Sequence, residues 1–230
     1  MPKPDAVIFD WDDTIVDTWH VVRSAINATL AHFGHAPWSE DEARKRIGPP
    51  ARVLFSGLFG EDKWQEADKI YIAAYQANIS EHIRVHDGAR DTLTALAAAG
   101  VPMAVVSTKR GPLLRAEAAQ LGLDGFFARM VGAGDAPADK PNAAAVQFAL
   151  EPLKITPSKS VLFIGDSVTD MVSAENADCI GILIETKPPA EDALALHPPK
   201  HRVKNHAELA DLLKSFIQTK PAHSRTPPAP

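Results

Sequence analysis

Cysteine and long apolar runs are scarce in this chain. Their scarcity argues against a disulfide-bonded protein and against a membrane-spanning one. One cysteine, Cys179, is present among 230 residues, so no disulfide can form within the chain, which fits a reducing compartment. No stretch reaches the roughly 18 uninterrupted apolar residues of a membrane-spanning helix. Residues 1–5 hold no apolar signal core, and a cytoplasmic protein with no membrane partner is therefore expected.

Positive charge is not in excess either. The chain carries 24 Lys and Arg side chains against 29 Asp and Glu, a net charge of -5, and no basic run that could follow a phosphate backbone. Nucleic acid is therefore not an expected partner. A hydrophobic share of 45% and a charged share of 23% are ordinary for a globular protein. A chain of this length can bury one good core and carry a smaller second domain.

The most informative feature that is present is a group of carboxylates, including Asp10 and Asp12, directly after the first apolar run at 6–9. A short apolar run bounded by polar residues predicts a buried strand. Open α/β sheets bind ligands outside the carboxyl ends of their strands. Two unit charges ~4 Å apart repel by about 4 kcal/mol at an effective dielectric of about 20. Close carboxylates here indicate a shared proton, a bound cation or an open aqueous site.

Three later segments also place polar residues at the ends of predicted strands. The apolar run at 101–106 leads into Ser107, Thr108 and Lys109, a run ending at Gly134 is followed by Lys140, and the run at 161–164 leads into Asp166 and Asp170. The carboxyl ends of parallel strands meet at one edge of a sheet, so these four segments are expected to form one site.

The segment between the first two of these motifs is predicted to be helical throughout. Apolar residues at spacings of three and four predict an amphipathic helix over 19–33. Ser39 and Glu42 have the spacing of a capping box and predict a second helix that stops by Ile47. Further helices are expected at 50–57 and 62–79. No strand is evident between Val16 and Arg84.

After this segment, short apolar runs alternate with helical patterns, which is typical of parallel βαβ units. Helices are predicted after a cap at Asp87, at 112–121, at 142–151, after Asp170, and after a capping box formed by Asn205 and Glu208. The last clear strand is expected at 180–184, and the proline-containing stretch 185–200 is predicted to be a loop.

The order of the four motifs resembles the haloacid dehalogenase-like (HAD) hydrolase superfamily, in particular its phosphoglycolate phosphatase-like branch. The resemblance covers about residues 5–185. It implies an α/β fold class with a doubly wound, Rossmann-like parallel sheet as the core, made of residues 1–16 and 86–217. An all-helical cap domain, residues 17–85, would be inserted and close over the site. Residues 218–230 are rich in proline and are expected to be a disordered tail.

The resemblance also implies roles for the motif residues. Phosphoryl transfer needs a nucleophile, neutralisation of charge on the phosphoryl oxygens and a proton for the leaving oxygen. Asp10 would be the nucleophile that forms an aspartyl-phosphate. Asp12 would protonate the leaving group and then activate water. Ser107 would donate to a phosphoryl oxygen, and Lys140 would offset the charge of the phosphate.

The cofactor implied by the resemblance is Mg²⁺, which prefers hard oxygen ligands and keeps several waters. Asp10 and Asp166 are the expected carboxylate ligands. The backbone carbonyl of Asp12 would be a third ligand, and Asp170 would bind through water or brace the site.

Six further residues are candidates for substrate binding. Three of them lie close to the motifs, and three lie in the expected cap: Thr14, Thr108, Lys109, Arg46, Gly48 and Arg52. The family usually has asparagine where this chain has Thr108, which affects the expected geometry of the phosphate pocket.

The function implied by the resemblance is magnesium-dependent hydrolysis of a small phosphate monoester, such as phosphoglycolate or a sugar phosphate. Asp12 favours phosphate chemistry, because the dehalogenating members lack an acid at this position. Two alternatives stay open: a sugar phosphomutase on the same core, and a non-hydrolytic phospho-aspartate signalling module. Such modules are about half this length and lack a helical insertion. The expected partner is a small phosphorylated metabolite, and the expected oligomeric state is a monomer or weak dimer.

Overall fold

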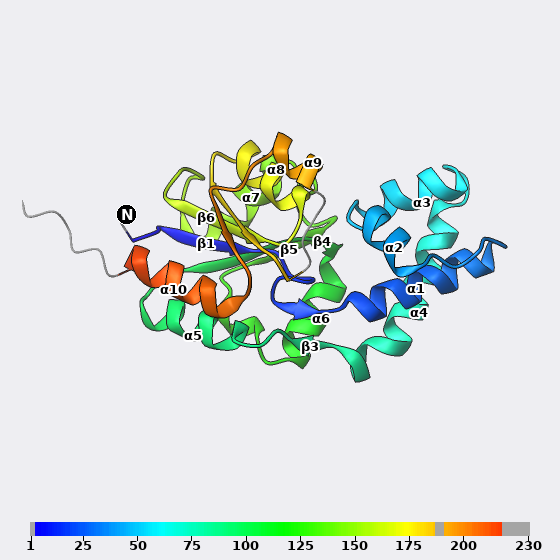
Figure 1. The fold of residues 1–230 in the computed structure, drawn as a ribbon, viewed down its shortest axis with the longest axis horizontal. Helices are drawn as coiled ribbons and strands as arrows, with labels where there is room; N and C mark the ends of the chain where they lie inside the picture. The colour runs from blue at the N-terminus through cyan, green and yellow to red at the C-terminus, as the bar shows by residue number, and fades with distance from the viewer. Residues whose placement is uncertain (1–2, 187–190, 218–230) are drawn as a thin grey trace, which may run out of the picture.

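The structure, a computed structural model, describes residues 3–186 and 191–217 (Figure 1). Within these ranges the core is a parallel six-stranded sheet in the order β5-β4-β1-β6-β7-β8. The strands are β1 (Ala6–Phe9), β4 (Met103–Arg110), β5 (Met130–Ala133), β6 (Val161–Gly165), β7 (Ile180–Ile184) and β8 (His201–Val203). The chain starts at β1, builds one side of the sheet and then the other, so the sequence order reverses beside β1. Open sheets bind ligands at such a switch point, and the predicted doubly wound fold is confirmed.

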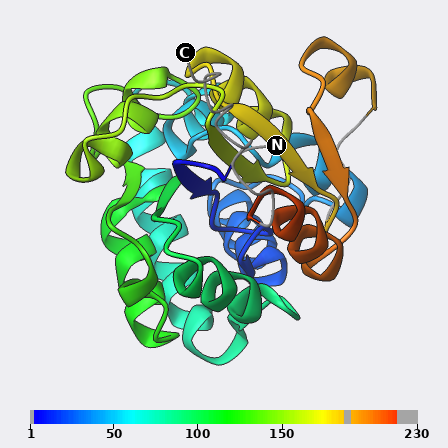
Figure 2. The ribbon, with the colours of Figure 1, turned by 90° about the vertical axis from the view of Figure 1, so that its left-hand side faces the viewer.

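Helices cover both faces of the sheet, because alternate residues of each strand point to opposite faces (Figures 1 and 2). Val7 and Phe9 of β1 belong to the apolar cluster that includes residues of α5, α6 and α10. Ala6 and Ile8 belong to the cluster that includes residues of α7, α8 and the buried Cys179. These helices are α5 (Ala89–Ala98), α6 (Gly111–Gln120), α7 (Ala143–Leu150), α8 (Val168–Asn176) and α10 (His206–Ile217).

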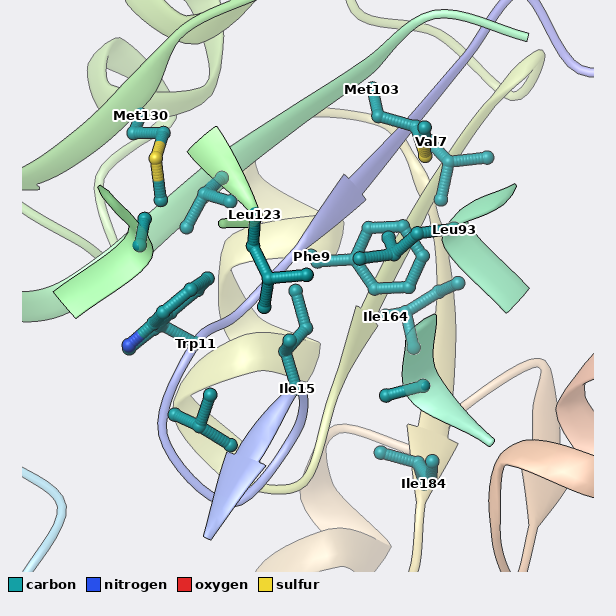
Figure 3. Close-up of a cluster of buried hydrophobic side chains, with 14 of the residues drawn as sticks. Val7, Phe9, Trp11, Ile15, Leu93, Met103, Leu123, Met130, Ile164 and Ile184 are labelled. Atoms are coloured by element: carbon teal, nitrogen blue, oxygen red, sulfur yellow. The ribbon is translucent and has the colours of Figure 1, made fainter. Parts of the chain in front are cut away.

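The larger of these clusters also anchors the loop that follows β1. Figure 3 shows Trp11 and Ile15 lying beside Leu123 and Phe9, among residues from several strands and helices. Trp11 and Ile15 have no exposed surface. Burying two such side chains stabilises the loop by several kcal/mol at about 1.5–3 kcal/mol for a large apolar side chain. The carboxylates on either side of Trp11 are therefore carried by a fixed segment of backbone.

A helical insertion, here called the cap, lies at the end of the sheet where the strands have their carboxyl ends (Figure 1). The cap consists of α1 (Trp19–His32), α2 (Glu40–Arg46), α3 (Ala51–Phe59) and α4 (Trp64–His82). It has its own apolar cluster, which includes Trp19, Leu30 and Trp38. The predicted capping box of Ser39 and Glu42 is confirmed at the start of α2. The domain limits 17–85 and 86–217 stay a prediction.

The two ends of the cap are joined by a short antiparallel pair that the sequence did not predict. Val16–Asp17 (β2) pairs with Arg84–Val85 (β3). The expectation of no strand between Val16 and Arg84 was wrong at its two ends. Strands of two residues show no periodicity in the sequence, and these form because the chain must leave and re-enter the core at one place.

Four other predictions differ from the structure. β4 continues through Ser107, Thr108 and Lys109, because it pairs again with β5 at Arg110 after an irregularity. The N-cap of α5 is Gly88, at φ 78°, and not Asp87. A Cβ at residue 88 would lie 3.2 Å from His206 Cβ, so tertiary packing adds to the preference for glycine.

The stretch 185–200 is not wholly a loop. It contains the helix α9 (Glu191–Leu196), and β8 follows it. Leu194 of α9 packs against Met171 and Leu183, which accounts for the helix despite the nearby prolines. The predicted capping box before α10 is half formed. Glu208 N–H donates to Asn205 Oδ1 at 3.0 Å, but the Glu208 side chain accepts from Lys204 N–H.

The predicted tail, residues 218–230, lies outside the described residues. Among the helices of the described ranges, none combines the length and the apolar character that crossing a bilayer would require.

Candidate active site

Asp10 lies at the centre of the candidate site, directly after β1. Its N–H donates to Ile164 O at 2.9 Å, which continues the pairing with β6. The residue is 7% exposed, and Lys140 Nζ lies 2.8 Å from its Oδ1. Burial raises the pKa of Asp10 to about 7, although Lys140 opposes the shift, and Asp170 adds to it.

The loop after Asp10 turns sharply back on itself. Asp13 has φ 55°, in the left-handed region that aspartate tolerates better than most residues. Ile15 N–H and Val16 N–H both donate to Trp11 O, at 2.9 and 3.1 Å. The turn keeps Asp10 and Asp12 at the carboxyl edge of the sheet.

Three buried carboxylates, from Asp10, Asp166 and Asp170, form one cluster. One oxygen of each lies within 4.8 Å of the others. Lys140 Nζ is the ammonium group beside them, and it forms ion pairs with Asp10 and Asp170. Burial lowers the pKa of Lys140, but the two carboxylates outweigh this and raise it, so Lys140 stays charged. Three hard oxygen donors with one compensating cation fit a small divalent metal ion.

Asp170 is braced from two sides. Its Oδ2 accepts from Ser167 N–H at 2.8 Å and from Ser167 Oγ at 2.5 Å, while its Oδ1 faces Lys140. Gly165 lies directly beneath, since a Cβ at that residue would lie 2.1 Å from Asp170 Cγ. The role of Gly165 was not predicted from the sequence. The position of Gly165 between an apolar strand and Asp166 is the feature of the sequence that could have indicated its role.

Thr14 and Ser107 complete the buried part of the site. Thr14 has no exposed surface, and its Oγ1 donates to Asp166 Oδ1 at 3.3 Å. Ser107 is 3% exposed, and its Oγ accepts from Lys109 N–H at 3.3 Å. Thr108 is half-buried beside it. Substrate binding by Thr14 and Thr108 stays a prediction.

Asp12 has different surroundings from Asp10. Its side chain is 26% exposed, and its Oδ1 accepts from Lys109 Nζ at 2.6 Å and from Thr18 Oγ1 at 2.5 Å. Lys109 is itself buried, at 9% exposed. Thr18 precedes α1 and forms no N-cap hydrogen bond, so its hydroxyl is used for Asp12 instead.

Two buried residues near Asp12 were missed in the sequence. Glu117 of α6 and Tyr75 of α4 both contact Lys109 Nζ, at 2.6 and 2.7 Å. Glu117 follows the apolar Leu114 by three residues, so it stands on the buried side of its helix. A charged residue such as Glu117 on the apolar face of a helix could have been recognised in the sequence as a candidate for a buried ion pair. Nothing in the sequence could have indicated the role of Tyr75, because it occupies an ordinary apolar position of α4.

The three cap candidates make contacts within the cap. Arg46 lies over the ring of Trp38, at 5.1 Å from the centroid, and borders a surface cavity of about 350 Å³. Arg52 lies over Trp64 at 5.3 Å, and Gly48 lies between α2 and α3. In the described ranges, no hydrogen bond or ion pair connects them to the carboxylate cluster. Their role in substrate binding stays a prediction.

Another arginine does connect the cap to the core. Arg110, at the end of β4, forms an ion pair with the buried Asp68 of α4. The cap therefore meets the carboxyl edge of the sheet through charged side chains as well as through Tyr75.

Comparison with known proteins agrees with this arrangement. The chain is 29% identical over 218 residues to phosphoglycolate phosphatase of Chromobacterium violaceum, covering 91% of this chain and 96% of that protein. It is 28% identical to pyrophosphatase PpaX of Bacillus velezensis, covering 75% and 79%. A crystal structure of a predicted phosphoglycolate phosphatase from Haemophilus somnus has the same fold, with a TM-score of 0.81 at 24% identity, covering 92% of this chain and 99% of that one.

A match to a whole family covers most of the chain. The sequence profile described as haloacid dehalogenase-like hydrolase matches residues 7–184, which include every residue of the carboxylate cluster as well as Asp12, Ser107 and Lys140. The chain therefore belongs to the haloacid dehalogenase-like hydrolases.

Proposed function

We propose that this protein is a magnesium-dependent phosphatase that hydrolyses small phosphate monoesters through an aspartyl-phosphate on Asp10. The observation that carries the proposal is the pairing of two carboxylates in unlike surroundings. Asp10 is buried beside Lys140, Asp166 and Asp170, whereas Asp12 is partly exposed and held by Lys109. Family membership makes the protein a hydrolase, and the phosphatase names among its relatives indicate a phosphatase.

In the proposed reaction, the Asp10 carboxylate attacks phosphorus while the bond from phosphorus to the leaving oxygen breaks. Asp12 gives its proton to that oxygen. Water then attacks the aspartyl-phosphate, and Asp12 takes the proton from this water, so each turnover restores both carboxyls. Lys140 and Ser107 would hold the phosphoryl oxygens.

Mg²⁺ would be held by Asp10, Asp166 and the backbone carbonyl of Asp12, with Asp170 binding through water or bracing the site. When bound, the ion would neutralise negative charge on the phosphoryl group. The hard, buried oxygen donors support this assignment.

The proposed substrates are phosphoglycolate or sugar phosphates. The likeness to pyrophosphatase PpaX makes pyrophosphate a second candidate. Membership of a hydrolase family weighs against a non-hydrolytic signalling module. A small phosphorylated metabolite is the proposed partner, and a cytoplasmic location stays a prediction.

The test is release of inorganic phosphate by purified protein from phosphoglycolate, sugar phosphates, glycerol phosphate and pyrophosphate. Each substrate is assayed with EDTA and with excess Mg²⁺, and the products are examined by phosphorus NMR so that transfer to a second sugar position is seen. We expect phosphate release that requires Mg²⁺. Undiminished turnover in excess EDTA would contradict the metal assignment, and exclusive transfer between sugar positions would favour the phosphomutase.

A further inference from the structure

Lys109 has no hydrogen-bond donor left for a substrate. An ammonium group has three N–H donors. Lys109 Nζ lies 2.6 Å from Asp12 Oδ1, 2.7 Å from Tyr75 OH and 2.6 Å from Glu117 Oε2. The predicted contact with a substrate would therefore require one of these bonds to break.

Glu117 joins Lys109 to two other parts of the molecule. Its Oε2 also accepts from Trp11 Nε1 at 2.9 Å, and its Oε1 accepts from Tyr75 OH at 2.8 Å. Trp11 stands between Asp10 and Asp12 in the chain, whereas Tyr75 belongs to the cap. The group therefore connects the loop after β1, the core helix α6 and the cap helix α4.

The electrostatics favour the charged form of Lys109. Burial alone lowers the pKa of Lys109, but the carboxylates of Asp12 and Glu117 outweigh it and raise this pKa. Burial raises the pKa of Glu117, against the effect of Lys109. A buried ammonium group is costly unless it is paired on every side. Lys109 meets that condition only while Asp12 stays in place.

The contacts of Asp12 leave one of its oxygens available. Lys109 and Thr18 both bind Oδ1, and no described residue donates a hydrogen bond to Oδ2. A carboxyl group that transfers protons must have one oxygen free and the whole group fixed within hydrogen-bond reach of the reacting atom.

We propose that Lys109 is a positioning residue for Asp12, and that Glu117 and Tyr75 make this position depend on the placement of the cap. The inference rests on the proposed function, since it concerns the group that exchanges protons in that reaction. Small inserted domains complete catalytic sites as they close. Here the hydroxyl of Tyr75, which belongs to the cap, contacts both Lys109 and Glu117, and Lys109 in turn binds Asp12.

The test compares two substrates of nearly the same shape, p-nitrophenyl phosphate and phenyl phosphate. The first has a leaving group that needs little protonation, and the second needs a proton from Asp12. For Lys109→Met, we expect the rate of enzyme phosphorylation, measured by rapid quench, to fall about tenfold to a hundredfold with phenyl phosphate and about threefold or less with p-nitrophenyl phosphate. A purely structural role would lower both rates by the same factor.

Two further variants guard against misfolding and test the link to the cap. Lys109→Met alone leaves buried carboxylates without a cation, which could disturb folding. The double variant Lys109→Met, Glu117→Gln removes one positive and one negative charge. We expect its rate of phosphorylation to fall more with phenyl phosphate than with p-nitrophenyl phosphate, as in the single variant. Tyr75→Phe removes only the hydroxyl, and we expect about fivefold loss with phenyl phosphate. Lys159→Met is the control, because Lys159 is exposed and pairs with Asp178.

The outcomes separate the inference from the proposed function. Equal losses with both substrates, in variants whose circular dichroism and melting temperature match wild type, would overturn the positioning role while leaving the phosphatase intact. Normal phosphorylation of Tyr75→Phe by phenyl phosphate would overturn the link to the cap. Wild-type protein that releases phosphate neither from these two substrates nor from the phosphorylated metabolites and pyrophosphate named above would overturn the proposed function, and the inference with it.

Discussion

Asp10 and Asp12 carry the same carboxyl group in two different surroundings. The side chain of Asp10 is 10% exposed, and it shares Lys140 with Asp170. The side chain of Asp12 is 26% exposed, and it shares Lys109 with Glu117. Placing like groups in unlike surroundings is how active sites give them separate roles. The contrast supports covalent chemistry at Asp10 and proton transfer at Asp12.

The first prediction concerns Asp10→Asn. The amide keeps the size of the side chain but is a poor nucleophile, so we expect a folded protein with essentially no turnover. Initial rates of phosphate release, together with circular dichroism, check this. If the folded variant keeps more than about a tenth of the wild-type rate, only ~1.4 kcal/mol of barrier separates the two proteins. Asp10 would then not be the nucleophile.

At the scale of elements, the site depends on how closely β6 and α8 approach each other. Gly165 ends β6, and Asp170 lies in the first turn of α8. Ser167 and Lys140 hold the Asp170 carboxylate from two sides, so it has little room to move. The Asp170 carboxylate can lie against residue 165 only because glycine has no side chain.

The second prediction follows from this packing. In Gly165→Ala, the new Cβ would lie 2.1 Å from Asp170 Cγ, so we expect a loss of about 1–3 kcal/mol in the free energy of unfolding and a raised Mg²⁺ requirement. Gly57→Ala in α3 is the matched control, because nothing lies within 4 Å of its Cβ. Alanine there should stabilise the protein by roughly 0.5–1 kcal/mol. Urea denaturation of both variants measures the difference, and equal stabilities would contradict the packing argument.

The elements also show which parts of the structure a sequence can predict. Asp10 and Asp166 could be named because each follows an apolar run, and strand ends of a parallel sheet converge. Lys140 could be named only from its position between two of the motifs that carry the family resemblance. The amphipathic helices of the cap were predictable for a similar reason, since their pattern repeats over many residues. β2 and β3 were not, because two residues carry no pattern. The contact of Lys109 with Tyr75 was not predictable either, because it forms only when the cap packs against the core.

At the scale of the whole molecule, several contacts beside the site join the cap to the core. β2 and β3 pair at the junction, Arg110 binds Asp68, and Tyr75 reaches Glu117. The cap helices therefore contact the edge of the sheet where the carboxylates lie. Binding at this edge and the stability of the folded chain should depend on each other.

The third prediction is a linkage between Mg²⁺, pH and stability. Burial raises the pKa of Asp10 from 3.8 to about 7, so the metal-free folded state binds this proton more tightly than the unfolded state does. The contribution of Asp10 to the free energy of unfolding is then largest at low pH and is lost as pH rises from about 4 to about 7. Mg²⁺ competes with the proton for the same carboxyl.

We therefore expect excess Mg²⁺ to raise the melting temperature more at about pH 8 than at about pH 5, relative to EDTA at each pH. Asp10→Asn should lose most of this pH dependence, because its side chain does not titrate. An equal effect of Mg²⁺ at both pH values in wild-type protein would contradict the assignment of Asp10 as a ligand.

The central claim is that phosphate passes through Asp10 and that Asp12 moves the protons. Asp12→Ala tests it most directly with p-nitrophenyl phosphate, whose leaving group needs little protonation. We expect a rapid burst of p-nitrophenol about equal to the enzyme concentration, because phosphorylation of Asp10 proceeds. Turnover after the burst should be about 10²–10⁴-fold slower than in wild type, because no base activates water.

Mass spectrometry of the quenched Asp12→Ala protein should then find the phosphoryl group on the peptide that contains Asp10. Steady release of p-nitrophenol with no burst, and no phosphoryl group on that peptide, would contradict the account.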